Sequence, residues 1–344
     1  MAEIDIRKEN HVGRITLNRP HALNAITFNM CYQIEKAIDE WLVDTSVALI
    51  MIDAIGNRAF CAGGDLSQMY QSGLKEDYSY GHDFWRMEYR LNAKVSQSTK
   101  PIVSFLNGYT MGGGVGLGCH GSHRIVDETS QIAMPECTIG LVPDVGGSYI
   151  LSRNDGYLGE FLALTAKRLS PGDAIHCNFA DFFVSSSRWN ELKERLSKTG
   201  DINQIHQYNS PPPDATLTDE LKSDINQLFG QPVKEIETII RQESSPWHQE
   251  ISNRMKKNSP LSMACVFKLM QMQRQVTNIQ EALDREFRFT YRAAQYGDFI
   301  EGIRAQVIDK DYQPSWKHKS ISEVPDADVT LMLAPLGKHS LVWE

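Results

Sequence analysis

The sequence lacks the features that mark several large classes of protein. No apolar run reaches the roughly 20 residues of a membrane-spanning helix, which disfavours an integral membrane protein. There is no long basic run, and the net charge of −8 argues against DNA or RNA as the main partner. The six cysteines form no CxxC pair, as is typical of reduced core thiols in a reducing compartment.

The N-terminal residues show no targeting signal. They have neither the apolar core of a signal peptide nor the arginine-rich character of a transit peptide. We therefore predict a cytoplasmic protein if the chain is full length, with a removed organelle signal as the alternative.

Motifs of nucleotide and serine-esterase chemistry are also missing. There is no GxxxxGK[ST] phosphate loop and no GxSxG nucleophile elbow. Gly116, Gly118 and Gly121 match GxGxxG literally. A dinucleotide fingerprint directly follows its strand, however, and the predicted strand ends at Leu106, so we interpret the match as coincidental.

His120, His123 and Asp127 could imitate a metal site. They lie across a predicted helix–strand junction and have no fourth ligand nearby in the sequence, so we predict structural histidines. No metal and no redox cofactor is expected.

Apolar patterning predicts an α/β core followed by a helical region. Strands are expected at residues 4–7, 12–17, 48–52 and 102–106. Thr27 is an expected N-cap, after which apolar residues recur at helical spacing. Further helices are expected at residues 78–95, 115–120, 157–165, 173–176, 190–196, 217–229, 233–241, 260–272 and 279–294. We predict an α/β core over residues 1–180, and a helical C-terminal region over residues 181–344 that completes or covers it.

One stretch, residues 107–153, contains both glycine clusters and carboxylates, which are residue types common in active sites. Three consecutive glycines, Gly112 to Gly114, suit a place where backbone closely approaches a ligand. A glycine turn before a helix also points amide N–H groups at that ligand, which favours an oxyanion. A similar glycine turn lies at residues 60–66.

Two carboxylates follow, each beside a proline that fixes its backbone: Glu136 after Pro135, and Asp144 after Pro143. An ionised glutamate can take a proton from water or attack a carbonyl carbon itself. The stretch is therefore a candidate active site, with ordinary turns and solvated carboxylates as the alternative.

These motifs resemble the crotonase superfamily, which has the enoyl-CoA hydratase and isomerase fold. The matching residues are 18–20, 23–25, 60–66, 107–108, 112–114, 135–136 and 140–143. The resemblance implies a crotonase (ClpP-like) α/β fold with a repeated ββα spiral core. It also implies an acyl-CoA substrate and, commonly, a homo-oligomer that is a trimer or hexamer.

Within the superfamily, the chain is most similar to the branch that hydrolyses 3-hydroxyisobutyryl-CoA. That similarity rests on residues 87–92, 111–117, 133–149, 301–305 and 308–311, and it is weakest over residues 187–247. It implies hydrolysis of the thioester to 3-hydroxyisobutyrate and CoA, a step in valine breakdown. 3-Hydroxypropionyl-CoA is implied as a second substrate.

The resemblance also implies roles for single residues. The backbone amides of Gly64 and Gly113 match the oxyanion hole that holds the thioester oxygen, and Glu136 matches a catalytic glutamate. The other glutamate of the hydratases falls at Gly116, which has no side chain. Asp144 stands where typical hydratases have glycine, and it matches the hydrolase branch as a second catalytic carboxylate. Glu88 matches a substrate contact of that branch.

Several alternatives stay open. Glu88 could be a purely structural helix residue, and Asp144 could cap a helix that begins near Gly146. Glu136 could act as a general base or as a nucleophile. The chain could also be an enoyl-CoA hydratase or isomerase on a short-chain acyl-CoA, or a non-catalytic protein that binds acyl-CoA or RNA.

Overall fold

The computed structural model describes residues 2–343 and contains two compact units, each assembled from separate stretches of the chain. The first comprises Met1–Gly64, Met87–Ala133 and Arg168–Thr216, and the second comprises Asp65–Arg86, Met134–Lys167 and Leu217–Glu344. Within residues 2–343, no helix is long and apolar enough to cross a membrane. The division into residues 1–180 and 181–344 stays a prediction.

The first unit contains a six-stranded sheet with the strand order β1-β2-β3-β5-β7-β9. β1 and β2 pair antiparallel, and every later neighbouring pair is parallel. The four strands expected from the sequence are confirmed as β1, β2, β3 and β5. The strands are β1 (Ile4–Glu9), β2 (Val12–Leu17), β3 (Leu49–Ala54), β5 (Ile102–Phe105), β7 (His123–Val126) and β9 (Phe182–Phe183).

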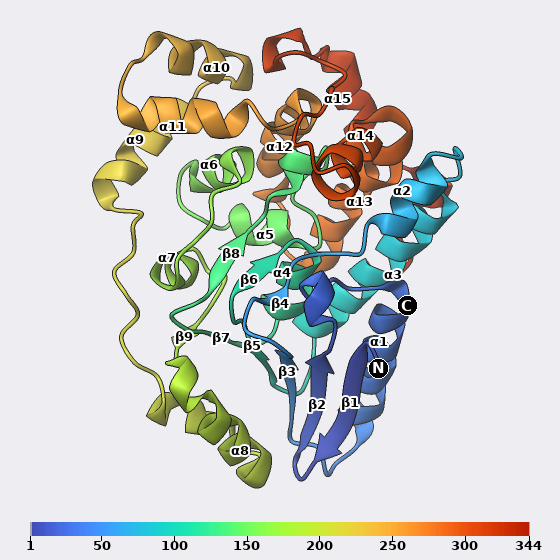
Figure 1. Ribbon diagram of the computed structural model, residues 1–344, viewed down its shortest axis with the longest axis vertical. Coiled ribbons are helices and arrows are strands. Elements are labelled where there is room, and N and C mark those ends of the chain that lie inside the picture. Colours follow the sequence, from blue (N-terminus) through green and yellow to red (C-terminus); the bar gives the residue numbers. More distant parts are fainter. Residues whose placement is uncertain (1, 344) are drawn as a thin grey trace. The chain divides into compact units, whose positions relative to one another are not determined.

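A second sheet of three short parallel strands carries the glycine turns. Its order is β4 (Ala59–Cys61), β6 (Tyr109–Met111) and β8 (Gln131–Ala133), and the strands lie side by side in Figure 1. These strands are not predicted from the sequence because three residues are too few to show an alternating pattern. α4 (Gly113–Gly118) follows β6 and begins two residues before the helix expected at 115–120.

Helices α1 and α8 pack on the six-stranded sheet. α1 (Phe28–Val43) begins at the expected N-cap, where the hydroxyl of Thr27 accepts the amide of Met30 at 3.2 Å. It packs against β1 and β2. α8 (Trp189–Thr199) buries Trp189, Leu192 and Leu196 in a core with side chains of β2, β3, β5 and β7. The first unit also contains α7 (Pro171–His176).

The second unit is mainly helical. The expected helical C-terminal region is confirmed, because α8 to α15 all lie after residue 181. The helices expected at 157–165, 217–229, 233–241, 260–272 and 279–294 are confirmed as α6, α9, α10, α12 and α13. α11 is not predicted, because its buried face consists of Ile251 and Met255 alone, too few to show a helical repeat. The helices are α2 (Ser67–Gly73), α5 (Gly147–Leu151), α6 (Leu158–Thr165), α9 (Asp219–Phe229), α10 (Val233–Gln242), α11 (Pro246–Met255), α12 (Pro260–Gln273), α13 (Ile279–Tyr296), α14 (Phe299–Ile303) and α15 (Asp326–Leu333). α3 (Ser79–Ser96) confirms the helix expected at 78–95.

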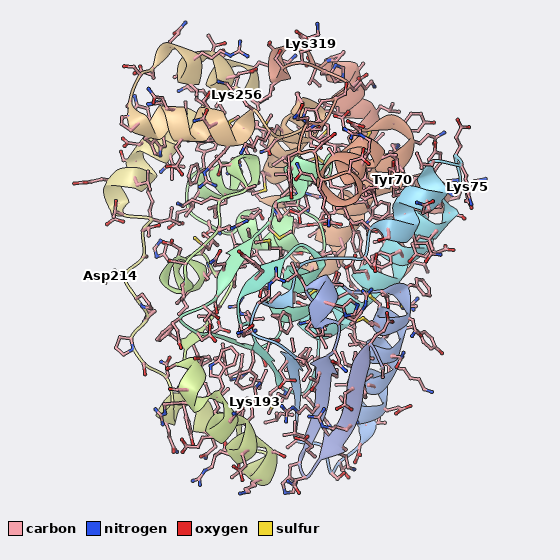
Figure 2. The ribbon with its side chains drawn as sticks, viewed as in Figure 1. Tyr70, Lys75, Lys193, Asp214, Lys256 and Lys319 are labelled. Atoms are coloured by element: carbon pink, nitrogen blue, oxygen red, sulfur yellow. The ribbon has the colours of Figure 1, made fainter. Side chains whose placement is uncertain are left out.

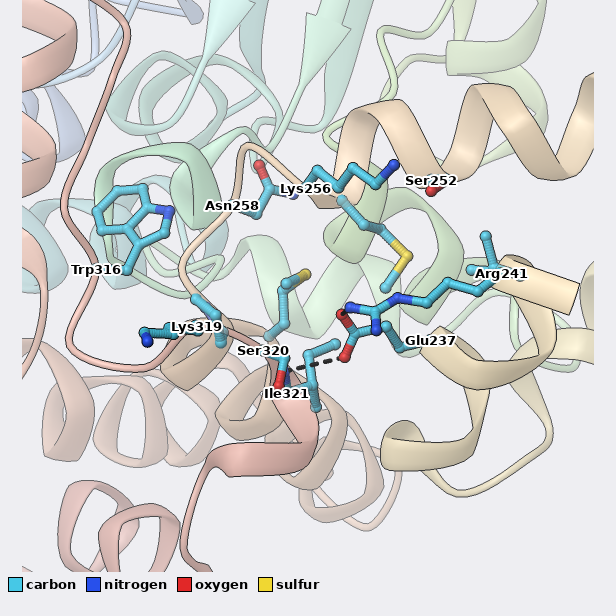
Figure 3. A pocket seen from close by; sticks show the side chains of 13 residues that line it. Glu237, Arg241, Ser252, Lys256, Asn258, Trp316, Lys319, Ser320 and Ile321 are labelled. Atoms are coloured by element: carbon cyan, nitrogen blue, oxygen red, sulfur yellow. Dashed lines mark hydrogen bonds and ion pairs between the residues drawn. The ribbon is translucent and has the colours of Figure 1, made fainter.

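The helical unit contains a cavity of about 100 Å³. Figure 3 shows side chains of its wall, among them Arg241, Trp316 and the buried Asn258. Lys256 and Lys319 also line it, and both are exposed (Figure 2). None of the predicted site residues lines this cavity.

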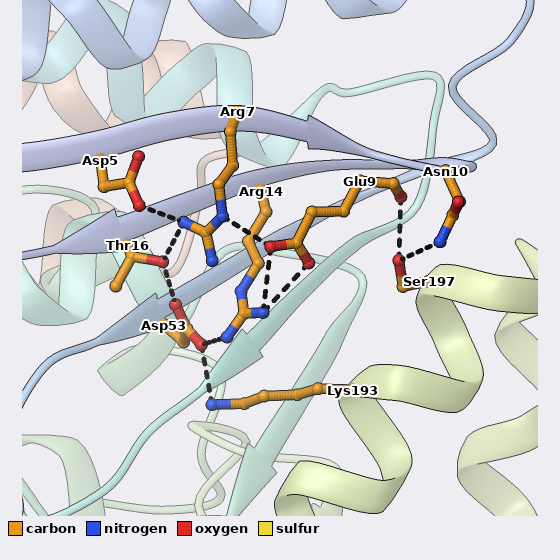
Figure 4. Close-up of polar contacts among 9 residues, drawn as sticks. All are labelled: Asp5, Arg7, Glu9, Asn10, Arg14, Thr16, Asp53, Lys193 and Ser197. Atoms are coloured by element: carbon orange, nitrogen blue, oxygen red, sulfur yellow. Dashed lines mark hydrogen bonds and ion pairs between the residues drawn. The ribbon is translucent and has the colours of Figure 1, made fainter.

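Buried charges connect α8 to the sheet of the first unit (Figure 4). Asp53 of β3 is 2% exposed and accepts hydrogen bonds from Arg14 Nη2 at 2.6 Å and from Thr16 Oγ1 at 2.7 Å. Lys193 Nζ of α8 donates to the same carboxylate at 2.8 Å. Burial alone would raise the pKa of Asp53, but Lys193 and Arg14 lower the pKa overall. The cluster therefore depends on an ionised carboxylate between two cations.

Candidate active site

The two glycine turns lie side by side in the first unit. The turn after β4 is held by the amide of Ile26, which donates to the carbonyl of Gly63 at 2.9 Å. The turn after β6 contains Gly112, with a φ of 51°, and α4 begins at Gly113. A Cβ atom on Gly113 would lie 3.3 Å from the amide nitrogen of Gly64. The structure thus brings Gly64 and Gly113 together, and their role as oxyanion donors stays a prediction.

Glu88 of α3 lies against Gly113. The residue is 3% exposed, and a Cβ atom on Gly113 would meet its Oε1 at 2.4 Å. Burial raises the pKa of the Cys61 thiol to about 12, and the negative charge of Glu88 adds to the rise. Glu88 is therefore a buried carboxyl group beside the glycine turns rather than part of a solvated helix face.

Two glycines of the literal GxGxxG match, Gly116 and Gly118, are part of helix α4. Gly116 and Gly118 are buried within it, and a Cβ atom on Gly118 would lie 2.5 Å from Cδ2 of Leu106. A Cβ atom on Gly121, after the helix, would lie 2.9 Å from the carbonyl oxygen of Ile102, so close packing accounts for the last two glycines of the match. Position 116 offers no carboxylate.

Glu136 and Asp144 belong to the second unit, and each is 4% exposed. Glu136 is the first residue of the short helix η2 (Glu136–Ile139), directly after Pro135. Helix α5 begins after Gly146, which is its N-cap and makes no side-chain cap bond. Asp144 is therefore not the N-cap of this helix, which was the structural alternative considered for it.

Another buried carboxyl group, Glu286 of α13, is not identified from the sequence. It is 0% exposed. Its Oε2 accepts the amide of Gly146 at 2.9 Å, and its Oε1 accepts the amide of Ser148 at 3.2 Å as well as the Ser148 hydroxyl. Burial raises the pKa of Glu286 to about 8, and the charge of Asp144 adds to the rise. The turn that carries Asp144 is thus tied to α13.

Two of the residues considered as metal ligands, His123 and Asp127, have structural partners. His123 stacks on Phe182 with ring centroids 5.8 Å apart, and its Nδ1 lies 2.9 Å from Ser122 Oγ. Asp127 accepts the amide and the hydroxyl of Thr129 and so closes a turn. Among the described residues, no three His, Cys, Asp or Glu side chains form a group that could hold a metal ion.

The chain belongs to the enoyl-CoA hydratase/isomerase family, whose family model matches residues 12–333. The expected crotonase fold is confirmed. A solved enoyl-CoA hydratase from Rhodobacter sphaeroides is 45% identical, with a TM-score of 0.94 over 99% of this chain and 100% of that chain. A solved carnitinyl-CoA dehydratase from Mycobacterium thermoresistibile is 34% identical, with a TM-score of 0.94 over 100% of this chain and 99% of that chain.

Other relatives are named as hydrolases rather than as hydratases or dehydratases. The mitochondrial 3-hydroxyisobutyryl-CoA hydrolase of Rattus norvegicus is 37% identical over 351 residues, which are 99% of this chain and 91% of that protein. The Homo sapiens protein of the same name is 37% identical over 350 residues, which are 98% of this chain and 90% of that protein. The chain is therefore a crotonase-family enzyme that acts on acyl-CoA, with relatives named for two types of reaction.

Proposed function

We propose that this enzyme hydrolyses the thioester of 3-hydroxyisobutyryl-CoA to 3-hydroxyisobutyrate and free CoA, with 3-hydroxypropionyl-CoA as a second substrate. Water supplies the oxygen of the new carboxyl group, the C–S bond breaks, and the departing thiolate takes up a proton. The hydrolase relatives, which match nearly the whole chain at 37% identity, support this assignment.

The observation that carries the proposal is glycine at position 116. A second glutamate of the family's hydratases matches this position, and Gly116 is buried inside α4 without a side chain. Glu136 is then the one remaining glutamate of the hydratase pair. Asp144 supplies the second carboxylate that matches the hydrolase branch.

In the proposed mechanism, the amides of Gly64 and Gly113 stabilise the negative charge that develops on the thioester oxygen. Preorganised donors of this kind are worth about 3–4 kcal/mol each. Glu136 removes a proton from the attacking water, or attacks the carbonyl carbon to form an anhydride that water then cleaves. Asp144 and Glu88 orient the substrate hydroxyl or the water. No metal or redox cofactor takes part, and CoA arrives with the substrate.

A hydratase or isomerase acting on a short-chain acyl-CoA is the second candidate, because the solved enoyl-CoA hydratase is 45% identical. This candidate predicts that the enoyl absorbance of crotonyl-CoA is lost without release of thiol. The hydrolase predicts thiol release from the two 3-hydroxyacyl-CoA substrates.

A thiol-release assay on these three acyl-CoAs tests the proposal. All six cysteines are buried, so a thiol reagent reports free CoA with little background from the native protein. We expect the rate to fall about 10²–10⁴-fold in Glu136→Gln and less in Asp144→Asn. Glu250→Gln is the control, because Glu250 is an exposed carboxylate of α11 that should not affect the rate. Equal rates for wild type and Glu136→Gln would refute the role of Glu136.

A further inference from the structure

The turn that carries Asp144 has a costly backbone conformation. Val145 has a φ of 51°, and Gly146 has a φ of 77°. A β-branched residue rarely adopts this left-handed region, and doing so costs about 1–3 kcal/mol. Such a turn persists only where surrounding contacts hold it in place.

Those contacts come from two helices much later in the chain. Glu286 of α13 accepts the amides of Gly146 and Ser148, one on each carboxyl oxygen. Gln273 of α12 donates to the hydroxyl of Ser148 at 2.7 Å and to the carbonyl of Ala282 at 3.0 Å. Glu286 and Gln273 are both 0% exposed. The two helices therefore fix the turn from the protein interior.

We propose that Glu286 is a positioning residue that clamps the turn at residues 144–148 and thereby orients the carboxylate of Asp144. The inference rests on the proposed function, in which Asp144 contacts the substrate. Glu286 acts through the backbone of the turn, because its oxygens are directed at the amides of Gly146 and Ser148. Leucine has a similar size but cannot accept these hydrogen bonds. Glutamine can keep the bond to Gly146 and donate to the Ser148 hydroxyl.

The charge around the clamp fits this role. The charge of Asp144 is among the causes that raise the pKa of Glu286, after burial itself. The neighbouring helices α5 and α12 present the uncharged Ser148 and Gln273, whereas Arg288 and Arg292 of α13 donate to backbone carbonyls at residues 332–334. A neutral Glu286 holds the turn without adding a second negative charge beside Asp144. Glutamine reproduces this neutral charge and the bond to Gly146, but it has no acceptor for the Ser148 amide.

The test compares Glu286→Leu with Glu286→Gln. Glu281→Gln is the matched control, because Glu281 is on the same helix with a side chain that is 41% exposed. For each variant, kcat and KM of thiol release are measured together with hydrogen exchange of the Gly146 and Ser148 amides. We expect Glu286→Leu to lower kcat about 10–100-fold, the size of loss that a misplacement of roughly 1 Å produces. Exchange of both amides should accelerate in Glu286→Leu. In Glu286→Gln the Gly146 amide should stay protected while the Ser148 amide, which then faces an NH2 group, exchanges faster, with kcat falling less than in Glu286→Leu. Glu281→Gln should stay close to wild type in both kcat and exchange.

A double mutant separates positioning from general damage to the fold. In the Asp144→Asn background, Glu286→Leu should lower kcat little further, because both changes remove the same contribution. If Glu286→Leu does not fold, Ser148→Ala takes its place. It removes the two hydrogen bonds of the Ser148 hydroxyl, to Glu286 and from Gln273, but keeps both amide bonds, and should show a smaller loss with the same non-additivity.

Wild-type kcat and exchange in a folded Glu286→Leu variant would overturn the inference. Full additivity with Asp144→Asn would do the same. If the wild type releases no thiol at all, the proposed function fails instead. The exchange of the Gly146 and Ser148 amides then still decides whether Glu286 holds the turn.

Discussion

Replacing Gly113 by alanine tests the two glycine turns directly. The added methyl group would lie 2.4 Å from Oε1 of Glu88 and 3.3 Å from the amide nitrogen of Gly64. Carbon and oxygen atoms approach to roughly 3.3 Å without strain, so the carboxylate or the turn must shift by roughly 1 Å. Glu88 is 3% exposed, and a close-packed interior leaves it little room to retreat.

The expected loss is larger in catalysis than in stability. In the proposed mechanism, alanine keeps the amide of residue 113 but displaces it from the thioester oxygen. Displacement is expected to cost up to as much as loss of one oxyanion donor, which lowers kcat about 10²–10³-fold, or roughly 3–4 kcal/mol. Overpacking of a buried site lowers the free energy of unfolding by about 1–3 kcal/mol. Thiol release under conditions where the variant is folded measures the first quantity, and a urea titration measures the second.

Gly118→Ala is the matched control, because Gly118 is a buried glycine of the same helix. Its added Cβ atom would lie 2.5 Å from Leu106 and 2.8 Å from Phe60, away from the paired amides. We expect a comparable loss of stability and a nearly unchanged kcat. The reasoning is refuted if Gly113→Ala keeps wild-type kcat, or if both variants lose kcat equally.

Two further predictions concern buried carboxyl groups. Asp53→Asn leaves Lys193 without this carboxylate and Arg14 with Glu9 as its partner, and should lower the free energy of unfolding by about 3–5 kcal/mol in a urea titration. Asp44→Asn breaks an exposed pair and should change it little. Folding lowers the pKa of Asp53, so its contribution to stability is complete above the unfolded pKa of about 3.9 and is lost as the pH falls through the folded pKa. The free energy of unfolding of Asp53→Asn should therefore depend less on pH in this acidic range than that of the wild type, and an unchanged pH dependence would contradict this. For Glu286 the sign is opposite, because folding raises its pKa from 4.5 to about 8 and the folded state keeps a proton that the unfolded chain loses. Stability should therefore fall as pH rises through this range, by up to roughly 1.4 kcal/mol per pH unit, and Glu286→Gln should remove that slope in urea titrations at several pH values.

The long strands and helices could be predicted from their apolar patterns, whereas the shortest elements could not. β3 and β5 are runs of buried residues, and α1 shows a regular apolar stripe that begins after its cap. β4, β6 and β8 have three residues each and are fixed by pairing with strands distant in the sequence. The glycine turns were predictable because few other residues tolerate such close backbone approach, whereas the burial of Glu88 against Gly113 required coordinates.

The sequence pattern could have identified Glu286 as a notable residue, but it could not have identified the residues that Glu286 contacts. On α13 the buried residues Ala282, Leu283, Phe287 and Ala293 recur at helical spacing, and Glu286 falls within that stripe. A carboxyl group on an apolar face must be paired, neutral or functional, because burying an unpartnered charge is too costly. The stripe could therefore have singled out Glu286 without coordinates. It could not have supplied the partner, because Gly146 lies 140 residues earlier and only the packing of α13 against α5 brings the two together. An acid inside an apolar helical stripe thus predicts an important contact, and the fold decides which backbone it holds.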